Sequence, residues 1–150
     1  MNVLAYTDNL TGVNNNTAYI HDIEKLVEQD KKFAIFIIDV NGLKIVNDTC
    51  GHDKGNELIV TVARCISEIF GDEFVYRIGG DEFVAVKTNI NDNKCDNLRE
   101  LLKQKFLQNK EIIKYSAAVG YSIYKANKDF EQVFKEADSK MYQDKKNMKM

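Results

Sequence analysis

The sequence has no proline or tryptophan, only two histidines, and three widely separated cysteines, Cys50, Cys65 and Cys95. Without a CxxC pair or a cysteine–histidine cluster, neither a zinc site nor a disulfide framework is expected, and the thiols are predicted to be reduced. No apolar run approaches the roughly 20 residues that span a bilayer, and the N-terminal residues lack the apolar segment of a signal peptide. We therefore expect a cytoplasmic protein without a membrane segment.

Arginine is also scarce: the positive charge comes almost entirely from lysine, and the formal net charge is -2. A protein that binds duplex nucleic acid usually has a basic face, so no nucleic-acid partner is expected. Hydrophobic residues make up 44% of the 150 residues and charged residues 29%, as in an ordinary globular protein. A chain of this length suits one domain. We expect residues 1–150 to form it, with residues 1–7 as a lead-in.

The near-continuous apolar run FAIFIIDV, residues 33–40, predicts a central strand that is buried on both faces. A hairpin at residues 75–87 and one or two strands within residues 112–124 would complete the sheet. Helical segments separate these strands, and two further helices flank the unit. The resulting βαββαβ order predicts an α/β (α+β) fold of the ferredoxin-like, palm-like type with a mixed or antiparallel sheet.

The helix boundaries follow from apolar spacing and from capping residues. The pattern predicts helices that begin at Asn16, the expected N-cap, and near Asp129, and further helices over residues 58–70 and 98–106. Three other segments are expected to be less regular: residues 1–13 as an irregular lead-in, residues 41–56 as a short helix broken by Gly51 and followed by a turn, and residues 88–95 as a polar loop.

The hairpin carries Gly79-Gly80, a pair that favours a tight turn with positive φ at both glycines. Asp81 and Glu82 follow directly, and two adjacent carboxylates at a tight turn repel each other and have low β propensity. A bound cation would explain them. An ordinary solvated hairpin tip is the alternative at this stage.

Asp39 ends the apolar strand and is costly to bury without a partner. It either caps the following helix or contributes to a ligand site at the strand end. In a βαββαβ sheet the first strand lies beside the hairpin, so Asp39 is expected near Asp81 and Glu82. Three carboxylates suit Mg²⁺ or Mn²⁺, with substrate phosphates completing the ligand shell. This arrangement favours phosphoryl or nucleotidyl transfer.

Four blocks of the sequence resemble the GGDEF domain family, the catalytic module of diguanylate cyclases. The signature itself is Gly79 to Phe83. The other blocks agree with the family in order and spacing over about residues 6–149. They are Asp8 to Asn14, Asp39 to Lys44 with Asn47-Asp48 and Gly51-His52, and Ala137-Asp138 with Met141-Tyr142 and Lys145.

The resemblance implies condensation of two GTP molecules into cyclic di-GMP with release of two pyrophosphates. Each domain would supply half of an active site, so catalysis implies a homodimer. Asp39 and Asp81 would bind Mg²⁺ or Mn²⁺ with the Val40 carbonyl as a further ligand. Glu82 would assist at the metal or help to deprotonate the attacking hydroxyl. Lys44 would neutralise charge on the triphosphate.

The resemblance also implies substrate contacts. Asn47 would read the guanine edge, and Lys145 would bind phosphate as a point charge. Backbone amides around Gly42 and Leu43, at the start of a helix, would cradle phosphates. A side chain at Gly79 or Gly80 would block the close approach of a nucleotide.

Several positions depart from the family pattern. Asn56 stands where a second guanine-reading residue is usually an aspartate, and an amide offers one acceptor where a carboxylate offers two. We expect looser purine selection. Lys149 replaces a frequent arginine and lacks its bidentate fork, and Asn41 is a common variation. The inhibitory RxxD positions read Phe70 to Glu73 without arginine, so we expect no tight product inhibition there.

Other functions stay open on the sequence alone. The main alternative is a catalytically weak GGDEF-like module that binds GTP or a partner as a regulatory or dimerisation unit. A different palm-like transferase and an HD-type phosphohydrolase using His52-Asp53 are more distant alternatives. The terminal lysines could also be a solvated helix face. Because the family usually carries a sensory domain upstream, we expect one in the full-length protein.

Overall fold

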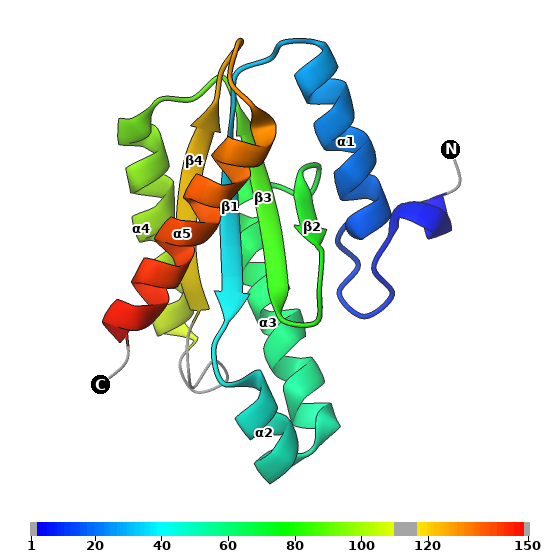
Figure 1. Ribbon diagram of the computed structural model, residues 1–150. Helices are drawn as coiled ribbons and strands as arrows, with labels where there is room; N and C mark the ends of the chain where they lie inside the picture. Colours follow the sequence, from blue (N-terminus) through cyan, green and yellow to red (C-terminus); the bar gives the residue numbers. More distant parts are fainter. Residues whose placement is uncertain (1–2, 110–116, 149–150) are drawn as a thin grey trace.

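The computed structural model describes residues 3–109 and 117–148, and the predicted βαββαβ order is confirmed in it (Figure 1). The four strands form one sheet in the order β2-β3-β1-β4, with every neighbouring pair antiparallel. The strands are β1 (Phe33–Val40), β2 (Val75–Arg77), β3 (Glu82–Thr88) and β4 (Ala117–Tyr124). The helices are η1 (Val3–Tyr6, a 3-10 turn), α1 (Asn16–Glu28), α2 (Leu43–Cys50), α3 (His52–Phe70), α4 (Asp92–Gln108) and α5 (Phe130–Met148).

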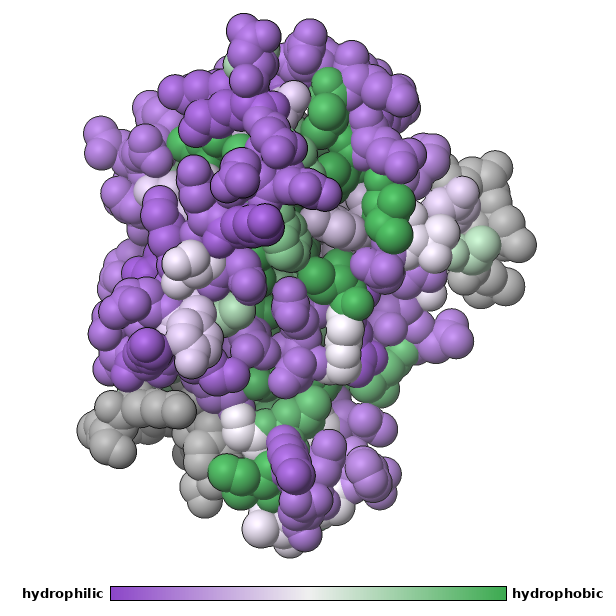
Figure 2. All heavy atoms as spheres, viewed as in Figure 1, coloured by the Kyte–Doolittle hydropathy of each residue, from purple (hydrophilic) through white to green (hydrophobic). Residues whose placement is uncertain are grey.

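Two helical layers enclose the sheet. Alternate residues of β1, from Ala34 to Val40, pack with α3 and α4 on one face, while Phe33, Ile35 and Ile37 pack with α1 and α5 on the other. This explains why β1 is apolar at almost every position, since no face of it reaches solvent. The outer surface over α1 and α5 is mostly hydrophilic, with scattered apolar patches (Figure 2). None of the described helices is long and apolar enough to cross a membrane.

Helix α1 begins at Asn16 as predicted and differs only in its N-cap, whereas α3 and α4 begin earlier than the sequence predicts. Asn15, rather than Asn16, caps α1, because its side chain accepts a hydrogen bond from the amide of Ala18. Helix α4 begins at residue 92 inside the predicted loop, where the Asn91 side chain accepts from the amide of Lys94. In both cases a capping asparagine starts a helix before its apolar periodicity becomes visible.

Helix α3 also begins earlier than expected, at residue 52 instead of near residue 58. Gly51 ends α2 and directly precedes α3, with a left-handed φ of 89°. The predicted turn is therefore the first turn of α3, in which the polar residues 52–54 are exposed and Gly55 is buried. Of the strand predicted within residues 112–124, residues 112–116 lie outside the described residues, and the rest forms β4.

The hairpin connection between β2 and β3 is longer than the predicted two-residue turn. The amides of residues 78 and 79 both donate to the Glu82 carbonyl, at 3.0 and 3.3 Å. Neither Gly79 nor Gly80 has a positive φ, so the prediction of left-handed glycines was wrong. The longer connection removes the constraint that a two-residue turn places on both residues.

Side chains of α4 and α5 pair with the outer edge of β4 at Val119. Asp144 of α5 accepts from the amide of Val119 at 2.8 Å, and Arg99 of α4 donates to the Val119 carbonyl at 3.0 Å. The Asp144 carboxylate, whose side chain is 10% exposed, also pairs with Arg99 at 2.8 Å and with Lys103 at 2.5 Å. These contacts satisfy edge groups that could otherwise pair with another chain, and they fasten α4 and α5 to the sheet.

We therefore expect Asp144→Ala to lower the free energy of unfolding by about 3 kcal/mol, because it leaves two half-buried cations, Arg99 and Lys103, without their shared carboxylate. Urea unfolding followed by circular dichroism would measure this change. Gln143→Ala, at the exposed neighbouring position, is the matched control and should have a small effect. Equal midpoints for the two variants would contradict the assigned role of Asp144.

Candidate active site

The carboxylates predicted from the sequence meet at one end of the sheet. Asp39, near the end of β1, lies directly opposite Glu82, the first residue of β3. The amide of Val40 donates to the main-chain carbonyl of Asp81 at 2.8 Å. The side chain of Asp39 is 14% exposed, whereas Asp81 is exposed. The register of β1 and β3 thus brings together three acidic residues from distant parts of the chain.

Lys145 supplies the positive charge at this site. Its Nζ lies 2.9 Å from Oδ2 of Asp39. The alternative in which Asp39 caps the next helix is not observed, since the N-cap of α2 is Gly42 without a side-chain cap bond. Burial raises the pKa of Asp39, and the hydrogen bond from Lys145 partly opposes this shift. The same hydrogen bond raises the pKa of Lys145.

Close packing of α5 on β4 positions Lys145. A Cβ on Gly120 would lie 2.1 Å from the backbone nitrogen of Met141 and 2.5 Å from the carbonyl oxygen of Ala137. Because these are helix backbone atoms, they could move only with the whole helix. The missing side chain at Gly120 therefore allows α5 to approach the sheet one turn before Lys145.

Negative charge at the site is not balanced by Lys145 alone. Burial raises the pKa of Glu82, and the charges of Asp39, Asp138 and Asp81 raise it further. Asp138 was not among the predicted site residues. The signal that could have found it is its spacing: it precedes Lys145 by seven residues, about two helical turns, and so shares its face of α5.

The residues present fit a hard divalent cation. Within residues 3–109 and 117–148, no group of three or more His, Cys, Asp or Glu side chains is arranged to hold a metal ion. Magnesium, however, is typically held by one or two carboxylates together with substrate phosphates. Asp39, Asp81 and Glu82 offer oxygen donors in a region where burial, and to a lesser extent neighbouring carboxylates, raise the pKa of Asp39 and of Glu82. They could hold Mg²⁺ or Mn²⁺ once phosphate oxygens complete the shell.

Most of the predicted substrate residues lie on α2 and α3, the two helices that follow β1 in the chain. Gly42, with φ of 76°, leads into α2, which begins at Leu43 and carries the exposed Lys44. Asn47 on α2 is half-buried and Asn56 on α3 is exposed. Lys149 lies outside the described residues.

The two glycines of the hairpin connection have no internal reason to be glycine. A Cβ on Gly80 would meet nothing within 4 Å, and one on Gly79 only a contact at 3.8 Å. Neither position has a positive φ. Folding therefore does not require glycine at either position. The close approach of a nucleotide to this backbone stays a prediction.

Arg77 fastens this connection to the N-terminal turn and was missed by the sequence prediction. It donates from Nη2 to the Gly80 carbonyl at 2.9 Å and from Nη1 to Asp8 at 3.4 Å. Asp8 in turn accepts from the amide and hydroxyl of Thr11, at 3.0 and 2.7 Å. The sequence signals that could have found this contact were Asp8, in the first of the four blocks, and Arg77, two residues before Gly79.

The positions of the inhibitory motif are used differently in this chain. Phe70 is buried, and its ring packs edge-on against Phe36 with centroids 4.8 Å apart. Asp72 and Glu73 are exposed. A core phenylalanine thus stands where the resemblance expects an arginine, and the absence of tight product binding there stays a prediction.

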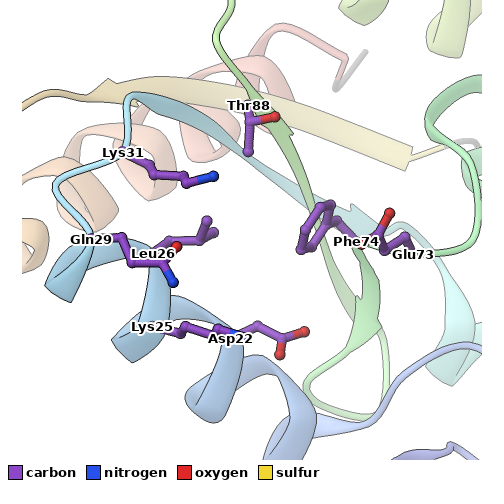
Figure 3. Close-up of a pocket in the computed structure, with 8 residues that line it drawn as sticks. All are labelled: Asp22, Lys25, Leu26, Gln29, Lys31, Glu73, Phe74 and Thr88. Carbon is purple, nitrogen blue, oxygen red and sulfur yellow. The ribbon is translucent and has the colours of Figure 1, made fainter.

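A cavity of about 380 Å³ lies away from the strand ends described above, between α1 and the segment leading into β2 (Figure 3). Lys25 and Lys31 line one side, and Glu73 and Phe74 line the other. It contains none of the predicted site residues. The converging carboxylates, rather than this cavity, mark the candidate active site.

Comparison with known proteins identifies the family of this chain. The profile of the family described as "Diguanylate cyclase, GGDEF domain" matches residues 5–150. A diguanylate cyclase from Vibrio cholerae is 29% identical over 96% of this chain, which spans 48% of that relative. This chain spans 19–25% of several other curated relatives.

Solved structures share the fold. The diguanylate cyclase SiaD from Pseudomonas aeruginosa, crystallised with its activator SiaC, has a TM-score of 0.83 at 20% identity, covering 97% of this chain and 60% of SiaD. The GGDEF domain of DgcB from Caulobacter crescentus, in complex with c-di-GMP, has a TM-score of 0.79 at 21% identity, covering 95% of this chain and 91% of that domain. With the family profile matching nearly its whole length, the chain belongs to the GGDEF domain family of diguanylate cyclases.

Proposed function

We propose that this domain is an active diguanylate cyclase that condenses two GTP molecules into cyclic di-GMP and two pyrophosphates. The observation that carries the proposal is the pairing of Asp39 with Glu82 across β1 and β3, with Asp81 beside them. Each 3′-hydroxyl would attack the α-phosphate of the other GTP, so two domains would meet as a homodimer. A bound Mg²⁺ or Mn²⁺ would stabilise charge on the attacking and leaving oxygens.

The chain's own residues would divide the remaining work. Glu82 would help to accept the proton of the attacking hydroxyl, because its raised pKa makes it a stronger base than an ordinary glutamate. Lys44, Lys145 and the amides that begin α2 would bind phosphate oxygens. Lys145 already faces Asp39 and would need only to exchange one oxygen partner for another.

Asn47 and Asn56 would contact the base, and Lys149 would add positive charge near the phosphates. We also propose that residues 1–150 act as one cytoplasmic domain with a sensory domain upstream in the full-length protein.

A weak or non-catalytic GTP-binding module is the second candidate. The observation that favours it is Asn56, which is exposed and lacks the carboxylate that would read guanine.

Incubation with GTP and Mg²⁺ or Mn²⁺, followed by chromatography, tests the main proposal. We expect cyclic di-GMP, with a rate that rises more steeply than linearly with protein concentration because two domains must meet. Asp81→Asn should reduce the rate by about a hundredfold or more through loss of a charged ligand. Bound GTP without any cyclic product at high protein concentration would favour the second candidate.

Replacing Asn56 by aspartate should restore stricter guanine selection. A carboxylate accepts from both guanine N1–H and N2–H₂ and adds a charged hydrogen bond worth about 1.5–3 kcal/mol. We expect the ratio of GTP to ATP turnover to rise by about tenfold or more in Asn56→Asp. Equal ratios in the wild type and the variant would remove Asn56 from base recognition.

Glu82→Gln tests the excess negative charge without substrate. The raised pKa means that Glu82 ionises less readily in the folded chain than in the unfolded one. The folded state therefore favours protonated Glu82, and this contribution to the free energy of unfolding is complete below the ordinary glutamate pKa of about 4.3. It is lost as the pH rises through the pKa of Glu82 in the folded state. At pH 7 in metal-free buffer we expect the variant to melt about 1–3 °C higher than the wild type. This difference should shrink toward pH 4.5.

Differential scanning fluorimetry across pH would measure both effects. Glu100→Gln, on the exposed surface of α4, is the matched control and should leave the melting temperature nearly unchanged. A lower melting temperature for Glu82→Gln at pH 7 would mean that Glu82 is stabilising, contrary to this prediction.

A further inference from the structure

Gly55 lies inside helix α3, at a position where the backbone conformation does not require glycine. It is buried in the first turn of α3, and its amide donates to the Gly51 carbonyl at 3.2 Å. Its φ is not in the left-handed region. Glycine is, after proline, the least favourable residue in a helix. Glycine at this position must therefore be explained by something other than its backbone conformation.

The space that a side chain would fill at Gly55 is occupied by the amide of Asn47. A Cβ there would lie 1.7 Å from Oδ1, 2.8 Å from Cγ and 3.4 Å from Nδ2 of Asn47. The Asn47 amide is half-buried against α3 and forms no hydrogen bond with the part of the chain that the structure describes. Contact with the glycine, rather than hydrogen bonding, sets where this amide lies.

We propose that Gly55 is a positioning residue for base recognition, acting through Asn47. The inference rests on the proposed function, in which Asn47 reads the guanine edge. Without a Cβ at residue 55, the Asn47 amide can lie against the first turn of α3, where Gly55 directly precedes Asn56. Its donor and acceptor atoms then remain unpaired for a purine edge.

A purely structural role for Gly55 predicts a different pattern of contacts. At Gly120 the atoms that exclude a side chain belong to the backbone of α5, so a larger residue must disturb the fold. At Gly55 the three nearest atoms all belong to the end of one flexible side chain, which can rotate away. A methyl group at residue 55 should therefore leave folding intact and displace the Asn47 amide.

Gly55→Ala separates these possibilities. We expect an unfolding midpoint equal to or above that of the wild type, because alanine favours helix. The preference for GTP over ATP should fall about five- to tenfold, as expected for losing one hydrogen bond to the base. In turnover, KM for GTP should rise with little change in kcat. Metal-free equilibrium binding of GTP and ATP provides a readout that does not depend on turnover.

The double variant Asn47→Ala, Gly55→Ala completes a thermodynamic cycle. Once Asn47 is alanine, the added methyl group has no amide to displace. It should then leave nucleotide preference unchanged and increase stability. Lys54→Ala, at the exposed preceding position, is the control for a helix substitution and should not alter preference in either background.

The outcomes are distinguishable. If the wild type prefers GTP and Gly55→Ala retains the same preference, the positioning role is wrong while the proposed function stands. If the methyl group lowers preference equally with and without Asn47, Gly55 acts by another route and the inference also fails. If the wild type binds neither nucleotide, both the proposed function and this inference are overturned.

Discussion

The ion pair between Asp39 and Lys145 is the interaction on which the candidate site depends. It joins the end of the central strand to the last helix across 2.9 Å. Burial and neighbouring carboxylates make ionisation of Asp39 and Glu82 unfavourable, and a single lysine offsets only part of that effect. The excess negative charge makes the site less stable alone and more receptive to a cation. Stability and function are thus in opposition at this strand end.

The rest of the fold holds these charges in place. An almost wholly apolar β1, packed on both faces, fixes the position of Asp39, and its register with β3 sets Glu82 opposite. Gly120 allows α5 to approach β4, which brings Lys145 within reach. Asp144 anchors the same helix at the sheet edge. Strands β1 and β3 and helix α5 therefore hold the carboxylates close together even though their negative charges repel.

Local sequence patterns predicted the elements better than their boundaries. The apolar run of β1 and the order of the strands were sufficient for the βαββαβ topology, because burial on both faces leaves a long, unmistakable signal. The starts of α3 and α4 were missed because their first turns are mostly polar and exposed. The hairpin glycines were assigned positive φ from a two-residue turn, but the backbone uses a longer connection.

The sequence by itself determined the family, the order of the elements and the meeting of Asp39 with the hairpin carboxylates. These follow from motifs and from topology, which depend on residue type and spacing along the chain. Only the tertiary structure decided that Lys145 faces Asp39, that Arg77 holds the Gly80 carbonyl, and that the Asn47 amide lies against Gly55. Such contacts join side chains from separate elements. Their formation depends on how closely those elements pack and on which rotamers the packing allows, and no local pattern encodes either.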